Sequence, residues 1–204
     1  MKIPSKIIKR LKKRDRKTFA WLFSQYKEII KGIALRYTKN EIAADDILQE
    51  TFIIAYEKIT QYEGRGSFEG WLKRITINLA LKHLKELKKE LAQLPEDYHQ
   101  EEVQEQEIDY KNVKSVVLNT KFTQEEIMEA VKELPDGFRT IFNLYVVEGY
   151  KHKEIAQMLG ISESTSKTQL LRARKNLQKK LYKIALEKHK QMRADNYKKF
   201  FNNQ

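Results

Sequence analysis

The chain has 204 residues, a formal net charge of +12 and no cysteine. The lack of cysteine excludes disulfide bonds and thiolate metal sites, and it favours a reducing, cytoplasmic setting. Only 3 prolines and 7 glycines interrupt a sequence that is rich in strong helix formers, so the composition predicts helix along most of the chain.

The positive charge lies in two segments that are separated by an acidic one. Residues 1–91 carry 21 basic and 11 acidic side chains, residues 92–122 carry 3 and 7, and residues 123–204 carry 16 and 10. Basic segments favour nucleic acid as a partner, and an anionic membrane surface second, although Lys-rich helices also serve solubility alone. No apolar run approaches the length of a membrane span or of a secretion signal, so we expect no insertion into a membrane.

The first predicted domain, 1–92, consists of three helical blocks. Apolar residues at steps of three and four form one stripe from Phe19 to Tyr37, a second from Ala44 to Ile59, and a third that includes Trp71, Leu72, Ile75 and Leu79. Two glycines within 62–67 predict a loop before the third helix. We expect the three stripes to pack into one small core.

A linker and a second domain follow. Residues 93–122 are predicted to be a flexible acidic linker, because seven acidic side chains and no Lys or Arg lie within 96–110. The second domain, 123–187, is expected to begin at Thr123, which can cap a helix together with Glu126. Ile127 is expected on the inner side of that helix. Residues 188–204 are predicted to be a polar, frayed tail.

Residues 153–165 carry the most specific local pattern, that of a helix-turn-helix. Gly160 permits the positive φ that ends the first helix, Ile161 fills the corner, and Ser162 caps the second helix. Ser166 departs from the pattern, because a β-branched apolar residue usually packs there. An ordinary helical hairpin with a basic surface is the alternative interpretation. The second helix presents side chains that suit phosphates and base edges in a major groove: Ser164, Thr165, Lys167, Thr168, Arg172 and Arg174.

The helix predicted over 41–60 carries polar and acidic side chains opposite its apolar stripe. Three interpretations stay open for this face: a solvated surface, a carboxylate metal site, or a docking face for a basic partner. No histidine lies nearby on the helix, which argues against the metal site, and we expect neither a metal nor a cofactor. The residues of this face are Asp45, Asp46, Gln49 and Glu50.

The glycine loop and the helix after it combine aromatic and basic side chains. Such a combination suits single-stranded DNA, which offers both phosphates and unstacked bases. The alternative is that the rings belong to the core, and we expect this for Trp71, which shares a stripe with Leu72 and Ile75. The candidate DNA-binding residues are Tyr62, Arg65, Phe68, Arg74, Asn78 and Lys82.

Taken together, these motifs resemble the extracytoplasmic-function (ECF) sigma factors of the sigma-70 family. The motif at 41–52, followed by Phe68, Trp71 and Asn78, resembles their domain two. Glu133-Leu134-Pro135, the helix-turn-helix and Arg172-Ala173-Arg174 resemble their domain four. The resemblance covers roughly 18–90 and 125–182. It implies an all-α protein with two small helical domains joined by a flexible acidic linker.

The resemblance also implies a function, that of a transcription initiation factor rather than an enzyme. The acidic face would bind the β′ clamp helices of RNA polymerase core, and the first helices of domain four would meet the β flap. The loop at 62–68 and its helix would read and open the −10 element of promoter DNA, and the helix-turn-helix would read the −35 duplex. An anti-sigma factor would be a further partner. The alternatives are a helix-turn-helix regulator that is not a polymerase subunit, and a helical nucleic-acid enzyme.

Overall fold

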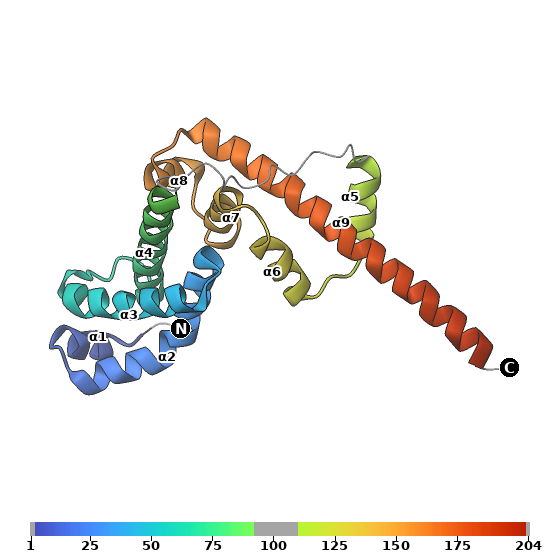
Figure 1. The fold of residues 1–204 in the computed structure, drawn as a ribbon. Helices are drawn as coiled ribbons and strands as arrows, with labels where there is room; N and C mark the ends of the chain where they lie inside the picture. The colour runs from blue at the N-terminus through green and yellow to red at the C-terminus, as the bar shows by residue number, and fades with distance from the viewer. Residues whose placement is uncertain (1–2, 92–109, 203–204) are drawn as a thin grey trace. The chain divides into compact units, whose positions relative to one another are not determined.

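The protein is described here by a computed structural model, which covers residues 3–91 and 110–202 (Figure 1). Throughout these ranges the ordered elements are helices and no strand occurs, so the predicted all-α class is confirmed. The chain divides into two compact units, Met1–Gln100 and Glu101–Gln204. None of the helices in the described part of the chain combines the length and the apolar character that a membrane crossing requires.

The first unit is built from four helices and one turn of 3₁₀ helix. These are α1 (Ser5–Lys12), α2 (Arg16–Thr38), α3 (Glu41–Lys58), η1 (Ile59–Gln61) and α4 (Phe68–Leu91). The turn between α2 and α3 is set locally: Lys39 adopts a left-handed conformation, and Asn40 Oδ1 accepts the backbone N–H of Ile42 at 2.8 Å and that of Ala43 at 3.2 Å. Helices α2, α3 and α4 all pack on one another.

The core of the first unit follows the predicted stripes, with one difference in α4. Leu22, Ile30 and Ile33 of α2 and Ala44 and Ile47 of α3 are all buried, and these two helices pack on each other. In α4, however, Phe68, Thr76 and Ile77 are buried, while Trp71 and Ile75 are only half-buried. The expectation that Trp71 rather than Phe68 belongs to the core is therefore wrong. Because α4 packs against two helices, its buried face is broader than a single stripe.

The second unit is organised along one long helix. Its elements are α5 (Tyr110–Asn119), α6 (Gln124–Lys132), α7 (Asp136–Phe142), the π-helical turn η3 (Asn143–Val147), α8 (His152–Leu159) and α9 (Glu163–Asn202). Helices α5, α6, α7 and α8 each pack against α9. Thr123 and Glu126 form the predicted capping box, with Thr123 N–H donating to Glu126 Oε2 at 2.8 Å.

The structure corrects three predictions about the second unit. Residues 110–119 were assigned to the linker, but they form α5, whose Val113 is buried. The sequence shows a short apolar patch at Val113–Leu118, but the acidic composition of the residues before it, which lie outside the described ranges, favoured a linker. The tail expected to fray continues α9 as helix to Asn202. Ile127, expected on the inner side of its helix, is 41% exposed, and Ala130 is buried instead.

Candidate docking face and nucleic-acid interface

The acidic face of α3 consists of Asp46, Gln49 and Glu50, whose side chains are exposed. Ala44, Ile47 and Leu48 fasten the opposite side of the helix to the core. Within the described residues neither Asp46 nor Glu50 makes an ion pair, so both charges are available to a partner. No group of three or more potential metal ligands forms in this part of the chain.

Asp45 differs from the other members of the predicted docking set. Its carboxylate is half-exposed, and Oδ1 lies 2.8 Å from the Nζ atom of Lys31, which also lies 3.0 Å from Glu41 Oε2. Hydrogen bonds to these two carboxylates raise the pKa of Lys31, the bond to Asp45 having the larger effect. Asp45 therefore joins α3 to α2, and its charge is already partly compensated.

Two exposed isoleucines extend the acidic face at both ends. Ile42 is 75% exposed and Ile53 is 58% exposed, and they are spaced four and three residues from Asp46 and Glu50. Residues at this spacing share one side of a helix. A purely solvated face gains nothing from exposed isoleucines, whereas a protein interface combines apolar and charged contacts. Ile42 and Ile53 were missed by the sequence analysis, although the helical spacing itself points to them.

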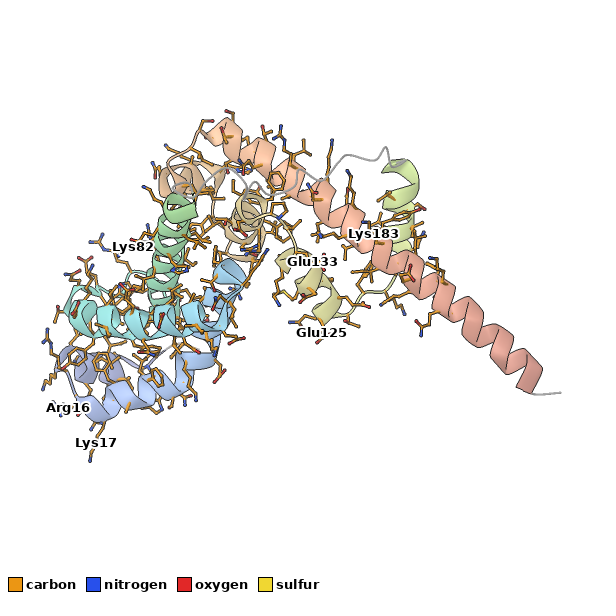
Figure 2. All side chains as sticks on the ribbon, viewed as in Figure 1. Arg16, Lys17, Lys82, Glu125, Glu133 and Lys183 are labelled. Carbon is orange, nitrogen blue, oxygen red and sulfur yellow. The ribbon has the colours of Figure 1, made fainter. Side chains whose placement is uncertain are left out.

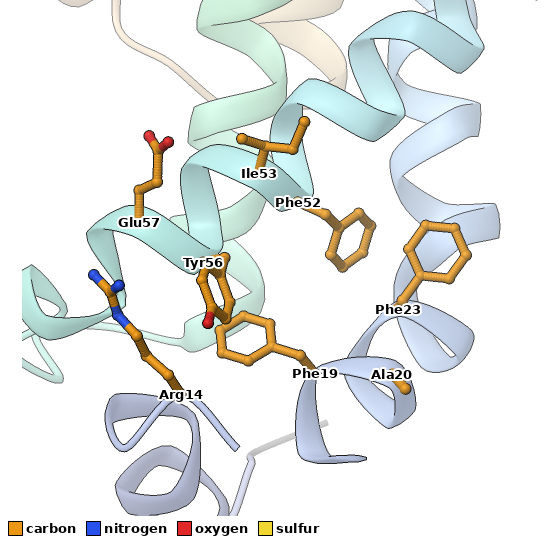
Figure 3. A pocket seen from close by; sticks show the side chains of 8 residues that line it. All are labelled: Arg14, Phe19, Ala20, Phe23, Phe52, Ile53, Tyr56 and Glu57. Atoms are coloured by element: carbon orange, nitrogen blue, oxygen red, sulfur yellow. The ribbon is translucent and has the colours of Figure 1, made fainter. Parts of the chain in front are cut away.

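A shallow groove of about 540 Å³ adjoins this face between α2 and α3 (Figure 3). Phe19 meets Tyr56 edge to face, with 4.7 Å between ring centroids, and Phe23 meets Phe52 in the same way at 4.9 Å. Because Ile53 lines the groove, the groove continues the apolar edge of the acidic face.

The loop before α4 is held by aromatic side chains that point inward. Tyr62 and Phe68 are 8% and 3% exposed, and their ring centroids lie 5.3 Å apart in edge-to-face contact. Tyr62 Oη donates a hydrogen bond to the carbonyl of Gly66 at 3.0 Å. Neither ring is exposed for stacking on a base in this arrangement, and the contact of these two residues with DNA stays a prediction. Their role here is to position the loop.

The exposed polar groups of this region lie on the loop and along α4. Arg65 projects into solvent and pairs with Glu63 at 2.7 Å. Arg74, Asn78 and Lys82 are exposed and follow one another at intervals of one helical turn, so the structure brings these three together on one side of α4. Figure 2 labels Lys82 on this helix. This row is a polar and basic strip beside the loop.

The helix-turn-helix has the predicted local geometry. Gly160 has a φ of +67°, and the N–H of Ile161 returns to the carbonyl of Ala156 at 3.1 Å. Ser162 Oγ accepts the backbone N–H of Thr165 at 2.9 Å and thereby caps α9. The same Oγ atom lies 2.8 Å from the hydroxyl oxygens of both Ser164 and Thr165, so these two predicted DNA-binding side chains already have polar partners.

The remaining predicted DNA-binding residues of α9 lie on its surface. Lys167, Thr168, Arg172 and Arg174 are all exposed. Lys167 pairs with Glu163 at 2.7 Å across one turn. The guanidinium carbon of Arg174 lies 5.9 Å from the ring centroid of Tyr145, so this side chain also takes part in packing within the unit.

Ser166, which departs from the usual pattern, is fully buried and has a polar partner. Its Oγ atom lies 2.9 Å from Nδ1 of His152 in α8. The His152 ring in turn stacks on Tyr145, with 4.4 Å between centroids. A hydrogen-bonded pair thus replaces the apolar contact at the centre of the helix-turn-helix. Sequence reasoning detected the anomaly at Ser166 but not its partner, which lies in another helix.

Burial lowers the pKa of His152, and the nearby charges of Lys167 and Arg174 lower it further, while Glu163 acts in the opposite direction. The unfolded chain therefore binds a proton at His152 more readily than the folded chain does. We expect folding stability to fall as the pH drops below the ordinary histidine pKa of 6.5.

The variant His152→Gln removes this titration. Its thermal unfolding, followed by circular dichroism from about pH 8 to about pH 5, should therefore depend less on pH than that of wild type. His189→Gln, at an exposed histidine, is the control. Equal pH dependence in wild type and His152→Gln would refute the prediction.

Comparison with known proteins finds two family matches. The pattern described as "Sigma-70 region 2" matches residues 22–90, and that described as "Sigma-70, region 4" matches residues 124–177. The chain is 31% identical to the ECF RNA polymerase sigma factor SigW of Bacillus subtilis over 185 residues, which cover 86% of this chain and 95% of SigW. It is 27% identical to the ECF RNA polymerase sigma-E factor of Haemophilus influenzae, over 86% of this chain and 93% of the relative.

A similar solved structure is that of the sigma factor RpoE from Bartonella quintana in complex with the anti-sigma factor NepR. It has a TM-score of 0.50 and 20% identity, and the match covers 81% of this chain and 97% of that protein. At 20% identity this similarity supports a shared fold alone.

Proposed function

Because the chain belongs to the ECF RNA polymerase sigma factors of the sigma-70 family, we propose that its two units divide the tasks of one transcription initiation factor. The first unit docks on RNA polymerase core and opens the −10 element, and the second reads the −35 duplex. The observation that carries this division is that the region 2 match falls within the first compact unit and the region 4 match within the second.

Polymerase docking is assigned to the acidic face of α3. Asp46 and Glu50 offer uncompensated charge to the basic side chains of the β′ clamp helices, and Ile42 and Ile53 offer apolar contact on either side. Asp45 contributes less, because Lys31 already pairs with it. In the second unit Ile127 and Met128, each 41% exposed on α6, supply apolar surface for the β flap.

Contacts with the opened −10 strand are assigned to Arg65, Arg74, Asn78 and Lys82, while Tyr62 and Phe68 hold the loop from within. Cations along α4 suit phosphates, and the Asn78 amide suits the edge of an unpaired base. The −35 duplex is assigned to α9, where Lys167, Thr168 and Arg172 are exposed within the first three turns.

Replacing Lys167 or Arg172 by alanine is expected to weaken binding to −35 DNA. A lost base contact costs about 1–3 kcal/mol and relaxes specificity at one position, whereas a lost phosphate contact weakens all sequences alike and lowers the salt slope by about one. Footprinting of the holoenzyme at several salt concentrations separates the two cases. Lys183→Ala, an exposed lysine farther along the same helix, is the matched control (Figure 2). Protection equal to wild type in both variants would exclude this surface.

The proposed function is tested by adding the purified chain to RNA polymerase core and sequencing the transcripts made from total genomic DNA. We expect transcripts that begin at a limited set of sites sharing −35 and −10 elements. If the chain is instead a helix-turn-helix regulator that is not a polymerase subunit, its addition to core would produce no transcripts from new start sites. We also propose that the chain acts in the cytoplasm and has no catalytic role. An anti-sigma factor is a further proposed partner, because the similar sigma factor RpoE was solved in complex with the anti-sigma factor NepR.

A further inference from the structure

Two segments that lie outside the family matches pack against each other in the second unit. The region 4 match ends at residue 177, but α9 continues to Asn202. Helix α5 lies before the start of the same match, at residue 124, and it packs on α9. Val113 of α5 and Ala185 of α9 are both buried. The extension of α9 thus provides a surface for a segment that belongs to the connection between the two units.

Lys188 of α9 fastens the residues that join α5 to α6. Its Nζ atom donates hydrogen bonds to the carbonyl of Lys121 at 2.9 Å and to Glu126 Oε2 at 2.6 Å. It also lies 5.6 Å from the centroid of the Phe122 ring. The next residue, His189, has Nε2 3.5 Å from Thr120 Oγ1. Three interactions therefore converge on the Lys188 ammonium group, and the contact of His189 with Thr120 lies next to them.

The Lys188 contact differs from an ordinary surface ion pair. The side chains of Lys188 and Glu126 are 30% and 27% exposed, so the pair is partly shielded from solvent. The same Glu126 Oε2 atom accepts the N–H of Thr123 in the capping box. The Lys188 ammonium holds the pKa of Glu126 below its usual value, with the backbone N–H of Thr123 contributing next. Lys188 thereby links the α9 extension to the first residues of α6.

We propose that α5 and residues 178–192 of α9 form a clasp, secured by Lys188, which sets the effective length of the connection between the two units and so helps to determine the promoter spacing that the factor accepts. This inference rests on the proposed function, in which the units bind two separate promoter elements. It assigns a specificity role to Lys188, a residue outside both DNA-binding surfaces.

The expected effect of the clasp follows from chain length. With the clasp closed, the connection comprises residues 92–109, and 18 residues reach at most about 60 Å. With the clasp open, it comprises residues 92–122, and 31 residues reach at most about 105 Å. A longer connection lets the two units bind promoter elements that lie farther apart. It also lowers the effective concentration of the second unit at its element when the two elements have the optimal spacing. The closed clasp therefore favours a narrow range of spacer lengths.

Hydrogen–deuterium exchange of the full chain, without DNA or polymerase, tests whether the clasp exists. In wild type the amides of α5 should exchange several-fold more slowly than in an unstructured peptide. Lys188→Ala and Val113→Asp should each accelerate exchange in α5 while leaving α7 and α8 unchanged. Lys190→Ala removes an exposed lysine whose one ion pair among the described residues is with Glu187, and it should change nothing. Exchange of α5 in wild type at the rate of an unstructured peptide would overturn the clasp.

Transcription by the reconstituted holoenzyme tests the effect on spacing. One cognate promoter is prepared with spacers lengthened and shortened in steps of one base pair. The two clasp variants should transcribe less from the optimal spacer and retain more activity at longer spacers, whereas Lys190→Ala should follow the wild-type profile. An unchanged profile in variants whose α5 exchanges faster would overturn the role in spacing. A wild-type chain inactive on every template would instead contradict the proposed function, and the exchange result would still stand.

Discussion

Reversing the charges of Asp46 and Glu50 is expected to weaken binding to RNA polymerase core about a thousandfold while leaving the protein folded. Both side chains are exposed on the outer side of α3 and make no ion pair within the described residues, so Lys at either position disturbs no internal contact. When a charge pair is buried at the centre of an interface with a basic partner, breaking it costs about 2 kcal/mol or more. The two changes together should therefore lower the affinity about a thousandfold.

This prediction is measured by fluorescence anisotropy of the labelled chain titrated with core, with circular dichroism as the check on folding. Glu28→Lys combined with Glu187→Lys alters net charge equally at exposed positions on α2 and α9, outside the proposed polymerase contacts, and it should leave the affinity near that of wild type. Asp45→Asn should have a smaller effect than either single reversal, because Lys31 already neutralises that carboxylate. Equal loss in the control and in the test variant would mean that overall charge, not the acidic face, governs binding.

Shortening the loop at 63–67, or replacing Asn78 by alanine, is expected to impair promoter opening without preventing closed complexes. Removing a base from the stack costs a few kcal/mol, which the protein must return through contacts with the unpaired strand. The loop depends on Gly64 and Gly66, whose φ angles of +79° and +87° favour glycine, and on the hydrogen bond from Tyr62 Oη to Gly66. A shortened loop cannot keep this arrangement.

Opening is measured by permanganate reactivity of unpaired thymines, and closed complexes by electrophoretic mobility at low temperature. Both variants should lose at least about tenfold in reactivity, the equivalent of about 1.4 kcal/mol. Gln25→Ala, which removes an exposed amide from α2, is the control for Asn78→Ala. Normal melting in both variants would mean that the strand contacts lie elsewhere.

Features that depend on neighbouring residues in the sequence were predictable, and features that depend on distant packing were not. The turn at Gly160, the cap at Ser162 and the capping box at Thr123 are set by residues within a few positions, and the structure confirms them. The burial of Phe68 in place of Trp71 depends on how α4 meets two other helices.

The candidate site shows the same division between local and distant causes. Helical spacing sufficed to place Asp46, Gln49 and Glu50 on one exposed face. The pairing of Asp45 with Lys31, and that of Ser166 with His152, each join residues 14 positions apart on different helices, which periodicity cannot reveal. Helix α5 escaped prediction because its stability depends on the α9 extension, about seventy residues away along the chain.

The central claim, that this chain is a subunit of the initiating polymerase, is tested most directly by its association with core in the absence of DNA. Purified chain and purified core are mixed and separated by size-exclusion chromatography with multi-angle light scattering. We expect a stable complex that contains one chain per core and resists competition by nonspecific duplex DNA. A chain that elutes apart from core, or that joins it only when promoter DNA bridges the two, would contradict this claim.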